Sequence, residues 1–128
     1  MSASRVLLVE DNPDNFELVR FLLEQAGYKV LEARNGRQGL DIARKELPDL
    51  ILMDLSLPEV DGWTAAAELK ADPATADIPL LALTAHTLPG DRQHALEVGF
   101  NGFVSKPINI AKFPETISFA LGKKKKSK

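Results

Sequence analysis

The sequence predicts an α/β domain in which five parallel strands form one sheet with helices on both faces, a doubly wound arrangement. Two observations predict it. Short apolar runs alternate along the chain with segments of helical spacing, and most of these runs are continuous. Continuous runs are typical of strands covered on both faces, as in parallel sheets. A strand followed by a helix, repeated along the chain, is the pattern of such a domain.

Five runs rich in Val, Leu and Ile are predicted as strands. In the second run, Lys29 and Glu32 flank Val30 and Leu31, so this strand is expected to be half exposed at an edge of the sheet. The predicted strands cover residues 5–9, 29–32, 50–53, 80–83 and 102–104.

The first helix has clear start and stop signals. Asn12 is a favourable N-cap because its side chain can accept a backbone N–H, and Pro13 suits the first helical position. Gly27 can adopt the left-handed conformation that ends a helix. Between them, one apolar stripe contains Phe16, Val19, Leu22, Leu23 and Ala26.

Four more helices follow. The second is predicted to end before Pro48, the third covers about 62–71, the fourth covers about 90–98, and Pro114 gives the last an irregular start. Their apolar anchors are Leu40, Ala43 and Leu47 in the second helix, Ala95 and Val98 in the fourth, and Ile110, Phe113, Ile117 and Leu121 in the last.

Length and composition exclude several classes of protein. The 128 residues, 45% hydrophobic and 27% charged, fit one globular domain, which we place at 1–122. The absence of cysteine excludes disulfides and thiolate metal sites. No apolar run approaches the roughly 20 residues of a membrane span, and the N-terminus lacks a signal peptide. A cytoplasmic location is therefore expected.

Charge is distributed unevenly along the chain. Segment 123–128 holds five of the sixteen basic residues, which leaves eleven basic against eighteen acidic residues in the rest. We predict that this segment is a basic, disordered tail. The acidic body is not typical of a nucleic-acid binder, but it could concentrate divalent cations.

Polar residues follow the predicted strands at the points where the strands end. In parallel sheets these points share one rim, where doubly wound proteins bind ligands. The residues at this rim are Glu10 and Asp11 after the first strand, Asp54 after the third, Thr84 and Ala85 after the fourth, and Ser105 and Lys106 after the fifth.

This set of side chains predicts phosphoryl chemistry. Neighbouring carboxylates repel one another and favour a hard cation such as Mg²⁺, which commonly binds carboxylates together with a phosphate oxygen. Lys106 and Thr84 are suited to hold phosphoryl oxygens. Asp54 is the central carboxylate and could act as the nucleophile that forms an aspartyl-phosphate. The turn after the first strand has no glycine-rich cradle, so neither a dinucleotide site nor a P-loop is indicated.

Four stretches of the chain resemble the receiver domains of two-component response regulators, specifically the stand-alone kind related to chemotaxis and cell-cycle regulators. They are "VLLVEDNPDN" (6–15), "PDLILMDLSLPEVDG" (48–62), "IPLLALTAH" (78–86) and "GFVSKPIN" (102–109). The resemblance spans about residues 5–121. It implies a flavodoxin-like (βα)5 fold with strand order 2-1-3-4-5.

The resemblance also implies the roles of the rim residues. A histidine kinase or phosphotransfer protein would donate a phosphoryl group to Asp54. Mg²⁺ would be bound by Asp11, Asp54 and the backbone carbonyl of Ser56, with Glu10 acting through water. The phosphoryl oxygens would contact Thr84, Ala85 and Lys106.

A switch and a lifetime control are implied as well. Thr84 would move toward the phosphoryl group and Phe103 would turn inward, which alters the surface of the fourth helix, fifth strand and last helix. Ser56 and His86 would tune the rate of dephosphorylation. The output would be a downstream protein contact or a phosphorelay step, from a monomer or a phosphorylation-dependent dimer. The chain would act in signalling and not as an enzyme.

Alternatives stand beside this interpretation. Asp54 could simply end a strand, and Glu10 and Asp11 could form a solvated acidic turn. Two other functions are a metal-dependent phosphatase acting through Asp54 and an unphosphorylated scaffold of the same fold. A phosphatase would need a second acid near the nucleophile, where this chain has Ser56.

Overall fold

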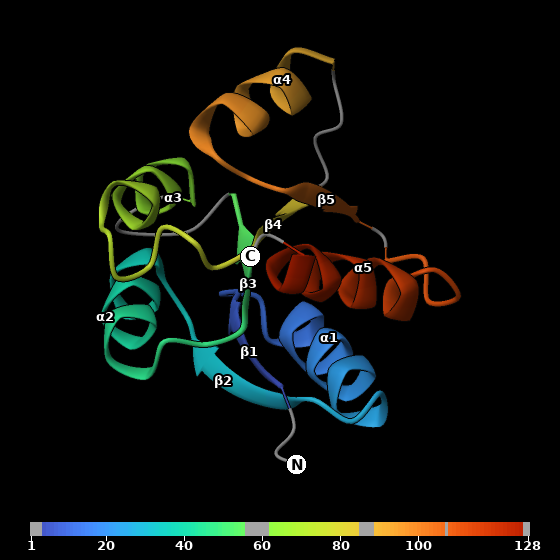
Figure 1. Cartoon of the computed structure of the whole chain (residues 1–128). Helices are drawn as coiled ribbons and strands as arrows, with labels where there is room; N and C mark the ends of the chain where they lie inside the picture. Colours follow the sequence, from blue (N-terminus) through green and yellow to red (C-terminus); the bar gives the residue numbers. More distant parts are fainter. Residues whose placement is uncertain (1–3, 56–61, 85–88, 107, 127–128) are drawn as a thin grey trace.

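A computed structural model describes residues 4–55, 62–84, 89–106 and 108–126 of the chain. Strands and helices alternate from one end of this part to the other, as predicted (Figure 1). The elements are β1 (Arg5–Val9), α1 (Pro13–Gln25), β2 (Lys29–Ala33), α2 (Gly36–Glu46), β3 (Leu50–Asp54), α3 (Gly62–Ala71), β4 (Leu80–Thr84), α4 (Pro89–Val98), β5 (Gly102–Ser105) and α5 (Phe113–Lys126).

The strands form one parallel sheet in the order β2-β1-β3-β4-β5, which confirms the predicted fold class and strand order. Val9 in β1 lies between Ala33 in β2 and Met53 in β3. The half-polar second strand lies at an edge, as expected. Strand order reverses between β1 and β3, so their carboxyl ends border the crevice where such sheets bind ligands.

Each face of the sheet packs against its own helices, because successive side chains of a strand point to opposite faces. Figure 1 shows α1 and α5 on one side of the sheet and α2 and α3 on the other. Leu52 of β3 packs on the first side with Phe16 of α1, whereas Met53 packs on the second side with Leu69 of α3. Burial on both faces explains why most strands are apolar throughout.

The ends of α1 form as predicted. Asn12 is the N-cap, its side chain accepts a hydrogen bond from the backbone N of Asn15 at 3.0 Å, and Pro13 is the first helical residue. Gly27 has a φ of 96° and ends the helix in the left-handed region.

Two predicted apolar anchors at helix C-termini are wrong. Ala26 is exposed and forms the C-cap of α1 instead of continuing its buried stripe. Leu47 follows α2 as a left-handed C-cap with a φ of 49°, and it is 48% exposed. A residue that precedes a proline is disfavoured in the helical region, and Pro48 therefore ends the helix before Leu47 can join its buried face.

The last helix begins later than its first predicted anchor. Ile110 precedes α5 and is 58% exposed, whereas Phe113 opens the helix and is buried. At its other end α5 continues to Lys126. Lysine is a good helix former, and its charge is favourable at a helix C-terminus.

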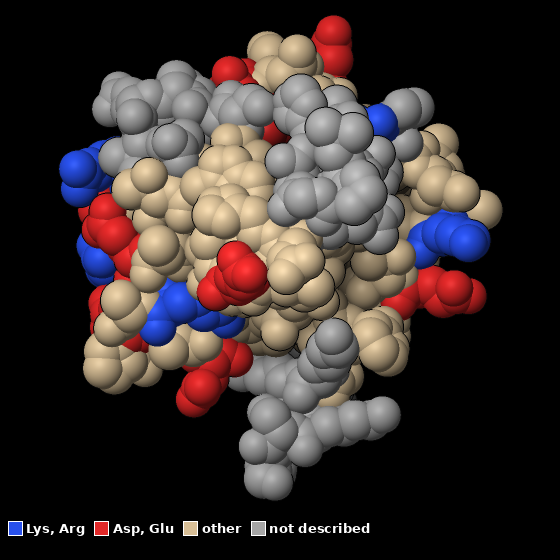
Figure 2. Space-filling model, turned by 90° about the horizontal axis from the view of Figure 1, so that it is seen from above, with Lys and Arg blue, Asp and Glu red and all other residues tan. Residues whose placement is uncertain are grey.

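The described surface mixes charges of both signs. In Figure 2 acidic and basic side chains lie next to one another, and no extended basic area covers the described residues of this face. Arg44 of α2, for example, pairs with Glu68 at 3.6 Å and Asp72 at 3.2 Å. None of the described helices is long and apolar enough to cross a membrane.

Candidate functional site

The candidate site lies at the carboxyl ends of the central strands. β1 leads directly into Glu10 and Asp11, and Asp54 is the last residue of β3. β4 ends at Thr84, and Lys106 directly follows β5. Because the strands are parallel, four segments far apart in the sequence deliver their polar side chains to one rim.

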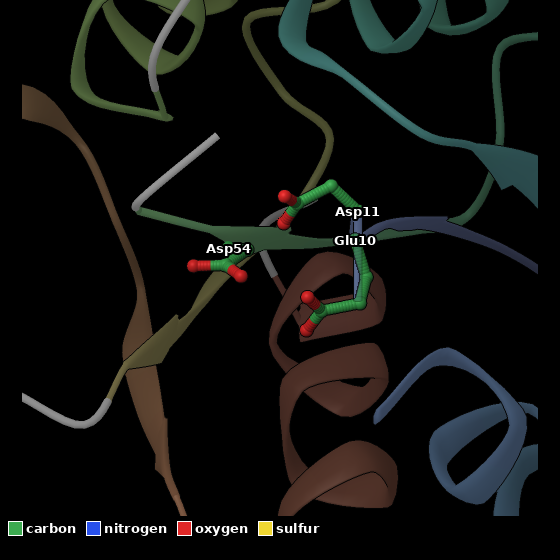
Figure 3. A group of neighbouring side chains, drawn as sticks. All are labelled: Glu10, Asp11 and Asp54. Atoms are coloured by element: carbon green, nitrogen blue, oxygen red, sulfur yellow. The ribbon is translucent and has the colours of Figure 1, made fainter. Parts of the chain in front are cut away.

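Three carboxyl groups meet at this rim. Oxygens of Glu10, Asp11 and Asp54 lie within 4.8 Å of one another, and the three groups turn toward a common space (Figure 3). Glu10 is 0% and Asp54 is 5% exposed, whereas Asp11 is exposed. The cluster is therefore closed on the protein side and open to solvent beside Asp11.

One ammonium group lies beside the acids. The Nζ of Lys106 donates a hydrogen bond to Oδ2 of Asp54 at 2.9 Å and pairs with Oε1 of Glu10 at 3.1 Å. The backbone N of Lys106 donates to the backbone oxygen of Thr84 at 2.9 Å. This last bond ties the end of β5 to the end of β4 and holds the lysine over the carboxylates.

Glu10 is the most constrained of the acids. Its Oε2 accepts a hydrogen bond from the backbone N of Asn12 at 3.1 Å, while its Oε1 pairs with the Nζ of Lys106 at 3.1 Å. Burial, and next a hydrogen bond with Asp54, raise the pKa of Glu10 from 4.5 to about 7. Ionisation of Glu10 is therefore unfavourable at this rim unless further positive charge is supplied.

Lys106 responds to the same surroundings. Burial lowers the pKa of Lys106, but the hydrogen bonds and negative charges of Asp54 and Glu10 outweigh it, and the net pKa is raised. The lysine therefore remains a cation and neutralises one of the three carboxylates when all are ionised. The remaining negative charge and the oxygen-only ligand set fit a hard cation such as Mg²⁺.

The two residues of the implied switch lie on neighbouring strands. Thr84 is 2% exposed at the end of β4, and Phe103 is half-buried on the edge strand β5, where it packs against the core on the side of α3 and α4. Ser56, Ala85 and His86 lie outside the described residues.

Sequence reasoning missed one residue of this site. A Cβ on Gly62 would overlap the backbone oxygen of Asp54 and would lie 2.7 Å from the Cα of Leu55. The first turn of α3 therefore rests directly on the backbone of Asp54. A signal was present, because a glycine opens the helix that follows the acid-bearing strand, but a sequence does not show which backbone it touches.

Binding of Mg²⁺ to this cluster is expected to stabilise the fold. A cation present at a hundred times its dissociation constant should raise the free energy of unfolding by about 2.7 kcal/mol. Urea unfolding with Mg²⁺ and with Na⁺ at equal ionic strength measures the gain.

The control for this measurement is a pair of matched variants. Asp11→Asn should lose most of the gain, whereas Asp14→Asn, at an exposed position on α1 outside the cluster, should keep it. Equal gains in the two variants would contradict a metal site at these acids.

Comparison with known proteins gives consistent matches. A family model described as the response regulator receiver domain matches residues 6–118. The polar-differentiation response regulator DivK of Brucella anthropi is 44% identical over 117 residues, which cover 91% of this chain and 95% of that protein.

Solved structures agree with these matches. The receiver domain of the sensor histidine kinase PA1611 from Pseudomonas aeruginosa, with a magnesium ion coordinated in its active site cleft, is 36% identical with a TM-score of 0.87. That match covers 94% of this chain and 99% of the other. Chemotaxis protein CheY4 of Vibrio cholerae is 29% identical with a TM-score of 0.88, over 93% of this chain and 99% of the other.

Proposed function

Because this chain belongs to the family of response regulator receiver domains, we propose that it accepts a phosphoryl group on Asp54 in a Mg²⁺-dependent reaction. One observation carries the proposal. Asp54 ends a buried strand with 5% exposure, 2.9 Å from the ammonium of Lys106 and beside two further carboxyl groups. A buried carboxylate is costly unless it is paired, and a carboxylate can serve as the nucleophile toward phosphorus.

The proposed step moves one phosphoryl group. A carboxylate oxygen of Asp54 forms a bond to phosphorus, the bond between phosphorus and the donor atom breaks, and the electron pair stays with the donor. Lys106, Thr84 and the segment at Ala85 would hold the phosphoryl oxygens. The position of Lys106 supports this assignment, because its ammonium group already contacts the carboxylate of Asp54 that would accept the phosphoryl group.

We assign the cation to Glu10, Asp11, Asp54 and the backbone carbonyl of Ser56. The close approach of three carboxyl groups and the uncompensated negative charge support this assignment. The magnesium ion in the related PA1611 receiver domain supports it as well. Mg²⁺ would supply the positive charge that lets an anionic phosphoryl donor approach the rim.

The proposed donor is a histidine kinase or a histidine phosphotransfer protein in the cytoplasm. Phosphorylation would draw Thr84 toward the phosphoryl group and turn Phe103 inward, which changes the surface of α4, β5 and α5 for a downstream protein. The positions of both residues support this movement, because buried Thr84 ends β4 and half-buried Phe103 lies on the neighbouring strand. Ser56 and His86 would set the lifetime of the phosphoryl group.

The test is the mass of the intact protein after incubation with acetyl phosphate, with and without Mg²⁺. We expect a gain of one phosphoryl group that requires Mg²⁺, with acetate released. Asp54→Asn should abolish the gain, and Asp14→Asn, the same chemical change at an exposed position, should leave it unchanged. Phosphorylation that persists in Asp54→Asn would overturn the proposal.

A further inference from the structure

An aromatic contact joins α3 to α4. The ring of Trp63, the second residue of α3, lies 4.5 Å from the ring of His94 on α4, with the planes inclined at 49°. Phe100, which follows α4, also contacts Trp63. The two rings are edge-on, with their centroids 6.0 Å apart. Phe100 is buried and belongs to the core, whereas His94 is exposed. His94 therefore adds a contact that burial of the core does not require.

The far ends of the two helices are also in contact. Gly99 ends α4 with a φ of 123°, and a Cβ there would lie 2.6 Å from Cγ of Lys70 in the last turn of α3. Lys70 is itself held in place, because its Nζ donates to the backbone oxygens of Ala76 and Ile78, each at 2.9 Å. Both ends of α3 are therefore in contact with the α4 segment, Trp63 with His94 in the middle of α4 and Lys70 with Gly99 just beyond it.

The end of α3 that carries Trp63 is also the end that touches the site. Gly62 rests on the backbone of Asp54 and Leu55, so that no side chain fits between them. A shift in the backbone of Asp54 must therefore move the first turn of α3, and Trp63 with it. Packed groups transmit such shifts because protein interiors have few voids to absorb them.

We propose that the Trp63–His94 contact couples occupancy of Asp54 to the position of α4, along a route through Gly62. The inference rests on the proposed function, because it requires a group that occupies Asp54. The observed arrangement is the one in which Lys106 pairs with the carboxylate of Asp54 itself. The Trp63–His94 contact belongs to this arrangement and favours it over the arrangement that a phosphoryl group would select.

Linkage makes the coupling measurable at the site. If the ring contact favours the arrangement without a phosphoryl group by a certain factor, removal of the contact must raise the affinity of Asp54 for a phosphoryl analogue by that factor. We expect His94→Ala to bind beryllofluoride with Mg²⁺ about threefold more tightly, the size that one aromatic pair can contribute. Fluorine NMR of the bound species measures this affinity.

Two variants serve as controls. His94→Phe keeps a ring against Trp63 and should bind beryllofluoride as the parent protein does. Leu96→Ala truncates a 59% exposed side chain on the same helix and should also leave the affinity unchanged. Trp63 is the only tryptophan in the sequence, so its emission reports the contact directly and should change when beryllofluoride binds.

The outcomes separate the two proposals. If the parent protein binds no beryllofluoride with Mg²⁺, the proposed function fails and the coupling fails with it. If the parent binds it but His94→Ala has equal or weaker affinity, the coupling alone is overturned. An unchanged Trp63 emission on binding would also overturn the coupling.

Discussion

Replacing Gly62 with alanine is expected to destabilise the fold by about 3 kcal/mol, as overpacking of a tight backbone contact does. The added methyl group would overlap the backbone oxygen of Asp54 and approach the Cα of Leu55 to 2.7 Å. Both neighbours are backbone atoms at the end of a buried strand and cannot rotate away. The helix must therefore move off the strand or the strand end must shift.

The same change should slow phosphorylation by acetyl phosphate about a hundredfold, because a displacement of the order of 1 Å at a reacting group costs that much. Urea unfolding and the rate of mass gain measure the two effects on the same sample. Gly122→Ala is the matched control, since nothing lies within 4 Å of a Cβ at that position in α5.

The control variant, Gly122→Ala, should raise the free energy of unfolding, whereas Gly62→Ala should lower it. Alanine in a helix is favoured over glycine by about 0.5–1 kcal/mol, so Gly122→Ala should be slightly more stable than the parent and phosphorylated at the same rate. A Gly62→Ala protein with the stability and rate of the parent would contradict the close approach of α3 to Asp54.

Glu10 is expected to make the fold less stable as the pH rises from about 4.5 to about 7 when divalent cations are removed. Its pKa is about 7 in the folded protein against an ordinary 4.5. Between these values the folded chain holds a proton that the unfolded chain has released, so the free energy of unfolding falls with rising pH. The fall attributable to Glu10 is about 3 kcal/mol.

Glu10→Gln should remove this fall. Glutamine keeps an oxygen that can accept the hydrogen bond from the backbone N of Asn12, but its side chain does not titrate. Urea unfolding at pH 5 and at pH 8 in EDTA gives the difference for each protein. Glu97→Gln makes the same change at an exposed position on α4 and should retain the parent's pH dependence. A parent and a Glu10→Gln variant with equal pH dependence would show that Glu10 is not protonated at neutral pH.

The prediction of the fold succeeded where one strong local signal was enough. The run at residues 50–53 is continuous and apolar, and it forms the central strand β3, buried along its whole length. Asn12, Pro13 and Gly27 mark the two ends of α1 because capping is chemistry between residues close in sequence. Local signals failed at Leu47. Helical spacing predicted that this residue is buried, but Pro48 restricts its backbone conformation and ends the helix before it.

The sequence by itself predicted the alternating strands and helices and the rim at which Glu10, Asp11, Asp54, Thr84 and Lys106 meet. These follow from repeated local patterns and from the rule that parallel strands present their carboxyl ends together. The strand order and the family followed from the resemblance of four stretches to a known family. Only the tertiary structure decided the contact of Gly62 with Asp54, the raised pKa of Glu10 and the contact of Trp63 with His94. Each of these depends on distances between groups far apart in the chain and on the exclusion of water around them, and neither is encoded in any short stretch of residues.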